Sequence, residues 1–148
     1  MDAANAFFQK VSKLLIKRFG KSGLYNDTID KYGIKAFGSK WNGCHSQDQI
    51  VWGIGYQIIN VDTSKKKGSH WVGLYITKGR VYVYDSFGRP TPKLLKILTK
   101  QAKTRGIKII DSERDPEQFG ELSEICGQLT MAWLQTIKQL GIKSALKI

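Results

Sequence analysis

Residues 65–88 place two ionisable side chains among apolar ones. In KKKGSHWVGLYITKGRVYVYDSFG, His70 stands near the front and Asp85 near the back of two runs rich in valine, tyrosine and isoleucine. Lys78 and Gly79 between the runs predict a β-hairpin with a two-residue turn. A carboxylate that holds an imidazole fixes its tautomer and raises its basicity, which is useful when the imidazole activates a nucleophile.

The expected hairpin register brings the two groups together. With this turn, Thr77 faces Arg80 and Val72 faces Asp85, so His70 and Asp85 become diagonal neighbours on one face at the open end of the hairpin. The register depends on the turn, because one extra residue would turn one strand over. A structural histidine–aspartate pair at the rim of a sheet would look the same, so a third residue is needed to indicate chemistry.

Cys126 is the candidate nucleophile, since a helix is predicted to begin there. The positive end of a helix and its free N–H groups stabilise a thiolate, and Gly127 would let a substrate backbone approach. Glu121 and Glu124 act against a thiolate, and a free cysteine is more often a small core residue. Cys44 is the competing nucleophile, but no helix is expected behind it.

Two cysteines without a secretory signal do not form a disulfide framework. A zinc site from Cys44, His45, His70 and Cys126 would have a spacing that fits no finger or knuckle, and adjacent ligands are awkward. We therefore expect no metal and no cofactor required for the chemistry.

The elements that must position these groups suggest one α+β domain over residues 1–148, with a small mixed sheet flanked by helices. Residues 20–47 are expected to be irregular. The expected elements are helices over 4–19, from Pro92 to about Arg105 and from Cys126 onward, and strands over 49–61, 70–77, 80–85 and 107–110. No apolar run reaches the roughly 18 residues of a membrane span, and the N-terminus is not ordered like a secretory signal.

The charge is strongly positive, with 24 basic and 12 acidic residues, a net charge of +12. Half of the acids fall between Asp111 and Glu124, so the rest of the chain is more basic still. Basic residues recur at helical spacing in two segments, which favours contact with nucleic acid over a merely soluble surface. These residues are Lys10, Lys13 and Lys17, and Lys93, Lys96, Lys100 and Lys103.

The order of these motifs resembles the adenovirus protease (adenain) family, within the group that includes the ubiquitin-like-protein-specific proteases. The resemblance covers roughly residues 25–140 and is carried by GSHWVGLYI, VYVYDSFGR and PEQFGELSEICG. The acid lies 15 residues after the histidine, and a glutamine lies eight before the cysteine. The resemblance implies the protease fold of that family.

The resemblance also implies roles for individual residues. His70 matches the general base, Asp85 the carboxylate that orients it, and Cys126 the nucleophile. Gln118 matches the glutamine whose amide helps to form the oxyanion hole, although the loop from Gln118 to Cys126 is about one residue longer than in adenain. Trp71 matches the aromatic residue that helps to shape a narrow substrate channel.

The resemblance implies the function of a viral cysteine endopeptidase, from an adenovirus-like virus, a virophage or a related DNA element. It would cleave capsid or core precursors next to small residues such as glycine during virion maturation. Viral DNA is the expected partner and a candidate activator. In adenain a cysteine links covalently to an activating peptide, and its counterpart in this chain would lie near Gly106 or Ile107. No cysteine stands there, so a disulfide-linked peptide activator is doubtful. We expect a monomer with no membrane partner, not secreted, in the virion and in the nucleus or cytoplasmic virus factory of the host cell.

Three alternatives remain open. The nearest is a protease for ubiquitin or a related modifier, which would cut after Gly-Gly on a folded protein. The second is a basic DNA-binding virion protein whose triad is incidental. The third is acyl transfer from acetyl-coenzyme A by the same three groups.

Overall fold

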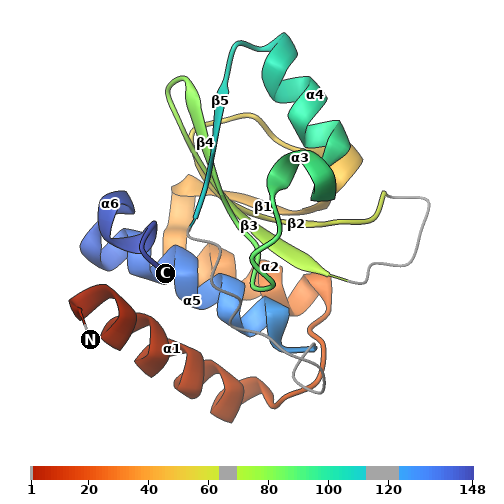
Figure 1. The fold of residues 1–148 in the computed structure, drawn as a ribbon. Helices are drawn as coiled ribbons and strands as arrows, with labels where there is room; N and C mark the ends of the chain where they lie inside the picture. The colour runs from red at the N-terminus through yellow and green to blue at the C-terminus, as the bar shows by residue number, and fades with distance from the viewer. Residues whose placement is uncertain (1, 64–69, 113–123) are drawn as a thin grey trace.

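The computed structural model describes residues 2–63, 70–112 and 124–148 (Figure 1). Its strands form one mixed sheet in the order β1-β2-β3-β4-β5. The outer pairs β1–β2 and β4–β5 are parallel, and the inner pairs β2–β3 and β3–β4 are antiparallel. The strands are β1 (Trp41–Ser46), β2 (Gly55–Asn60), β3 (Trp71–Thr77), β4 (Arg80–Tyr84) and β5 (Lys108–Asp111).

Helices cover both faces of this sheet, which makes the fold α+β (Figure 1). The helix α5 packs on β3, and α1 packs on α5 from outside, whereas α4 lies on the opposite face. The helices are α1 (Ala3–Phe19), α2 (Asn26–Phe37), α3 (Thr91–Leu94), α4 (Lys96–Thr104), α5 (Cys126–Leu140) and α6 (Ile142–Ala145). Short 3-10 turns span Gly38–Lys40 and Gln47–Gln49.

The predicted hairpin is confirmed, including its register. Thr77 pairs with Arg80 and Leu74 with Val83, and Gly79 in the turn has a φ of 78°, which favours glycine. The alternate residues of this hairpin form one core with α4. The core consists of the buried side chains Ile59, Val72, Leu74, Ile76, Val81, Val83, Leu95 and Leu98.

The prediction of an irregular segment over residues 20–47 is wrong, because α2 and β1 lie within it. The polar composition of α2 hides a narrow apolar stripe, in which Ile29, Gly33 and Phe37 are buried at helical spacing. Gly33 is required there because an added Cβ would lie 2.1 Å from the Trp41 ring. The contact joins α2 to the edge strand β1, and only the folded chain creates it.

Two other predicted elements are shorter than expected. The strand predicted over 49–61 is limited to β2, because Gln47–Gln49 is a 3-10 turn and Val51 and Ile54 are exposed. The helix predicted from Pro92 is broken at Leu95, whose φ of −125° and ψ of 73° are not helical and whose side chain is fully buried.

The other predicted helices begin where expected. The predicted helix over 4–19 corresponds to α1, and the helix predicted from Cys126 corresponds to α5, which begins at that residue. No helix within the described parts of the chain combines the length and apolar character that a membrane crossing needs.

Candidate active site

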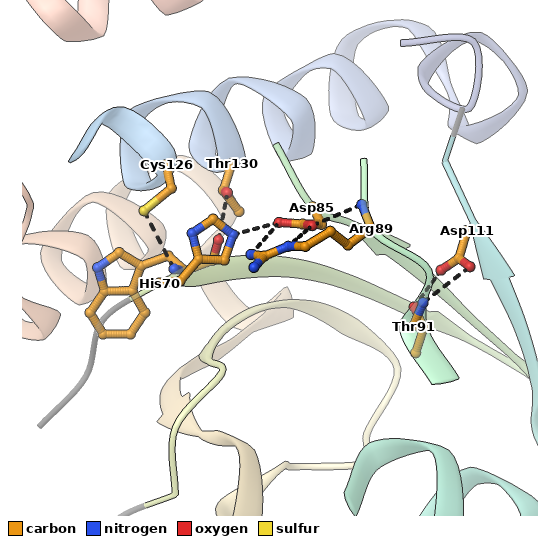
Figure 2. A network of polar contacts seen from close by, with 8 residues as sticks. His70, Asp85, Arg89, Thr91, Asp111, Cys126 and Thr130 are labelled. Carbon is orange, nitrogen blue, oxygen red and sulfur yellow. Dashed lines mark hydrogen bonds and ion pairs between the residues drawn. The ribbon is translucent and has the colours of Figure 1, made fainter. Parts of the chain in front are cut away.

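Three chain segments bring His70, Asp85 and Cys126 together (Figure 2). His70 comes immediately before β3, Asp85 immediately after β4, and Cys126 is the first residue of α5. All three are buried, with exposed fractions of 7%, 5% and 4%. The site therefore lies at the open end of the hairpin, on the side from which α5 approaches.

His70 and Asp85 form a close hydrogen-bonded pair. Nε2 of His70 lies 2.5 Å from Oδ1 of Asp85. Burial acts to raise the pKa of Asp85, but hydrogen bonds from His70 and Arg89 and the positive charges of both outweigh it and lower the pKa to about 2. Asp85 is therefore a carboxylate at neutral pH, and its bond to Nε2 leaves Nδ1 of His70 for another partner.

Cys126 is the partner on the other side of the imidazole. Burial acts to lower the pKa of His70, but hydrogen bonding and electrostatic attraction involving Asp85 and Cys126 outweigh it, so that the pKa is raised overall. The backbone N–H of Trp71 also donates to Sγ of Cys126, at 3.5 Å. The thiol thus meets an imidazole and a backbone donor at the N-terminal end of a 15-residue helix.

Close packing of α5 on β3 sets the position of Cys126. Thr130, one turn further along α5, donates through Oγ1 to the Trp71 carbonyl at 3.4 Å. Gly73 lies below it, and an added Cβ there would be 2.9 Å from Cγ2 of Thr130 and 3.4 Å from the Trp133 ring. Glycine at position 73 therefore lets the helix approach the strand closely enough for Cys126 to contact the peptide of Trp71.

The loop after α1 lies against the start of α5, which the sequence did not indicate. Nε2 of the fully buried Gln128 donates to the carbonyls of Gly20 (2.9 Å) and Ser22 (3.1 Å). The indole N–H of Trp71 donates to the carbonyl of Leu24 at 3.0 Å. These three bonds join residues 20–24 to the site.

The sequence predicts that Trp71 and Gly127 contact the substrate. Trp71 is half-buried beside Cys126, with its indole tied to Leu24. Gly127 is buried, and an added Cβ would lie 3.3 Å from the Leu24 side chain and 3.4 Å from Trp71. The structure therefore gives Gly127 a packing role against Leu24 and Trp71.

Arg89 belongs to the same network, although sequence reasoning missed it. Its Nε donates to Oδ2 of Asp85 at 2.8 Å, its backbone N–H donates to the same oxygen at 3.0 Å, and its Nη2 donates to Oδ1 at 3.3 Å (Figure 2). The one available signal was an arginine four residues after the acid in a turn sequence with glycine.

Gln118, the predicted oxyanion residue, lies outside the described residues, as do Glu121 and most of the acidic segment. No group of three or more histidine, cysteine, aspartate or glutamate side chains in the described ranges is arranged to hold a metal ion. Cys44, the competing nucleophile, lies in β1, where burial and the nearby Asp30 carboxylate raise its thiol pKa to about 12. At neutral pH Cys44 is therefore a thiol.

The predicted nucleic-acid residues lie apart from this network, on α3 and α4. Lys93, Lys96, Lys100 and Lys103 are all exposed, and three of them share one face of α4 at the spacing of successive helical turns. Lys96, Lys100 and Lys103 therefore form a solvated basic stripe on α4, opposite the buried Leu98 and Ala102.

Comparison of the chain with models of known protein families found no match, and a search among curated proteins also found none. The chemistry of His70, Asp85 and Cys126 is therefore inferred from their geometry.

Proposed function

We propose that the protein is a cysteine endopeptidase with Cys126 as nucleophile, His70 as general base and acid, and Asp85 as the carboxylate that orients His70. The observation that carries the proposal is the contact sequence of thiol, imidazole and carboxylate, assembled from three separate segments at the start of α5. A buried structural pair would account for His70 and Asp85, but not for a thiol placed on the other side of the imidazole at a helix N-terminus.

In this mechanism, Cys126 as thiolate attacks a peptide carbonyl carbon, and His70 as imidazolium donates its proton to the leaving amine. The thioester that remains is hydrolysed by a water molecule whose proton His70 accepts. Asp85 stays ionised and stabilises the imidazolium throughout, which agrees with its lowered pKa.

The oxyanion of each tetrahedral intermediate needs hydrogen-bond donors. The backbone N–H of Cys126, at the start of α5, is the proposed first donor, and the side-chain amide of Gln118 is the proposed second. The loss of one such donor typically costs about 100- to 1000-fold in rate.

The proposed substrates are capsid or core precursor polypeptides of an adenovirus-like virus, virophage or related element, cut next to small residues. Support comes from the resemblance in motif order, in which Trp71 matches the aromatic residue that shapes a narrow substrate channel; the backbone N–H of Trp71 contacts the thiol. The net charge of +12 and the exposed lysine stripe suit a protease that is packaged with viral DNA in virions.

The decisive experiment compares the two cysteines of the same molecule. Iodoacetamide labelling of Cys126 and Cys44 would be followed by mass spectrometry from pH 5 to 9, in the wild type and in His70→Ala. We expect Cys126 to label faster than Cys44 throughout this pH range and to lose this advantage in His70→Ala. Cys44 is the internal control, since its pKa of about 12 predicts slow labelling in both proteins.

If Cys126 labels as slowly as Cys44 and ignores the His70 change, the proposal is wrong, and intact DNA affinity would then favour a basic virion protein. If Cys126 is reactive, cleavage of peptides with glycine at the cut would be compared with cleavage of a modifier conjugate. Dependence on acetyl-coenzyme A would reveal acyl transfer instead.

A further inference from the structure

Arg89 surrounds the far side of the Asp85 carboxylate. Oδ2 of Asp85 accepts both from Nε (2.8 Å) and from the backbone N–H (3.0 Å) of Arg89, whereas Oδ1 accepts from His70 at 2.5 Å. Oδ2 is thus held by Arg89, whereas Oδ1 accepts the short bond from the imidazole and a longer one, of 3.3 Å, from Nη2 of Arg89. Donors on both oxygens restrict rotation of the carboxylate about its χ2 axis.

The backbone between the two residues is shaped for this contact. Gly88 donates its N–H to the Asp85 carbonyl at 2.8 Å and has a φ of 69°, which favours glycine. The turn sends the chain back toward the carboxylate, so that the N–H and the side chain of Arg89 reach the same acid.

Arg89 also contacts the imidazole indirectly. Its guanidinium lies 4.9 Å from the centre of the Phe87 ring, and that ring lies 5.2 Å from the ring of His70. The guanidinium therefore restrains two groups that contact His70: the Asp85 carboxylate and the Phe87 ring.

We propose that Arg89 is a positioning residue of the peptidase site: it orients Asp85 and, through Phe87, holds the His70 ring. This proposal rests on the proposed function for its effect on turnover, but the geometric part does not depend on it. Arg89 touches Asp85 and Phe87, so it acts through them.

The charges around Asp85 explain why Arg89 matters. Among the described residues, two charged or titratable groups contact the Asp85 carboxylate: His70, just before β3, and Arg89, in the turn after β4. Cys126 of α5 interacts with His70 and is linked to Asp85 only through it. The Asp85 side chain is 2% exposed, so little water replaces a lost donor, whereas that of Arg89 is 44% exposed and its charge remains partly solvated. Removal of the guanidinium leaves a buried carboxylate with His70 as its charged partner.

The test uses three full-length variants. Arg89→Gln removes the charge, Arg89→Lys keeps the charge but loses the two-pronged guanidinium geometry, and Arg80→Gln is the control. Arg80 is exposed at the opposite end of the hairpin. The measurements are the pH titration of the Asp85 carboxyl carbon by NMR, the rate of iodoacetamide labelling of Cys126 against pH, and kcat and KM on a cleaved peptide.

We expect Asp85 to titrate at higher pH in Arg89→Gln, and the acid limb of the labelling and turnover profiles to move in the same direction. Arg89→Lys should lie between this variant and the wild type, and Arg80→Gln should match the wild type. The value of kcat should fall by roughly 10- to 100-fold in Arg89→Gln with little change in KM, because the defect is one of orientation.

An unmoved Asp85 titration and an unmoved acid limb in a folded Arg89→Gln protein would overturn the inference. If that variant does not fold, Arg89→Lys decides in the same way, since wild-type behaviour there would show that the guanidinium geometry has no role. Failure of the proposed function would give a different result. The Asp85 titration would still move to higher pH in Arg89→Gln, but Cys126 would label slowly in every protein, including the wild type.

Discussion

His70 and Asp85 approach to 2.5 Å although neither belongs to a strand. The β3–β4 ladder ends at Gly73 and Tyr84, so the two side chains extend from the ends of their strands and converge beyond the last backbone pair. An interaction outside the ladder leaves the imidazole accessible to α5 from the other side. The hairpin register brings His70 and Asp85 to the same end, and the end of strand pairing at Gly73 and Tyr84 leaves room for α5 beside the imidazole.

Replacement of Asp85 by asparagine should slow catalysis strongly. The amide would leave His70 without the carboxylate that stabilises its protonated form, so we expect kcat/KM to fall by at least about 100-fold. Burial and the remaining contacts should keep the protein folded. Steady-state kinetics on a cleaved peptide, with circular dichroism as a control for folding, would check this, and near-wild-type turnover would contradict the assigned role.

Asp85→Asn should also lower the free energy of unfolding, by an amount that depends on pH. The pKa of Asp85 is about 2 in the folded protein, below the ordinary value of 3.8, so its ionised form stabilises the fold above about pH 4 and this contribution disappears as the pH falls toward 2. The wild type should exceed Asp85→Asn by about 2 kcal/mol in free energy of unfolding at neutral pH. Urea denaturation at pH 6 and pH 3 should show this difference shrinking in acid; a constant difference would contradict the prediction.

Gly73 should control the position of Cys126. Gly73→Ala places a Cβ 2.9 Å from Cγ2 of Thr130, so α5 must move or Thr130 must yield, at a cost of about 1–3 kcal/mol. We expect lower stability together with slower labelling of Cys126. Thr130→Ser in the same molecule removes Cγ2 and should restore much of both properties.

The control for this pair is Gly23→Ala, because an added Cβ at Gly23 has no atom within 4 Å. That variant should keep wild-type stability and labelling. Normal labelling in Gly73→Ala would show that the contact between α5 and β3 does not set the position of the thiol.

The basic stripe on α4 should contribute to DNA affinity. Replacement of Lys96, Lys100 and Lys103 by glutamine should weaken binding to duplex DNA and lower the slope of log K against log salt by up to about 0.9 per lost phosphate contact. Fluorescence anisotropy at several salt concentrations would measure both. The matched control also removes three charges, at Lys31, Lys35 and Lys40, which are exposed on α2 and in the 3-10 turn after it. Equal losses in the two proteins would argue for a diffuse charge effect.

The sequence by itself determined the elements whose pattern is local. The hairpin register follows from alternating residues around Lys78 and Gly79, and the start of α5 at Cys126 follows from the apolar periodicity after it. Because the ends of two paired strands must lie together, the contact between His70 and Asp85 was also predictable. These features depend on interactions between residues that are near in sequence or directly cross-paired.

Only the tertiary structure decided how the remaining parts meet. The α2 helix is not predicted from the sequence, because a glycine in a polar segment usually indicates irregular structure. In the fold, Gly33 lies inside the helix and allows close contact with the Trp41 ring. The bond from Gln128 to the loop after α1 and the Thr130–Gly73 contact join segments far apart in sequence, and no local pattern encodes such packing. Arg89 was missed for a related reason: an exposed arginine in a turn has many rotamers, and only the buried Asp85 carboxylate, with one oxygen already engaged by His70, selects the rotamer observed.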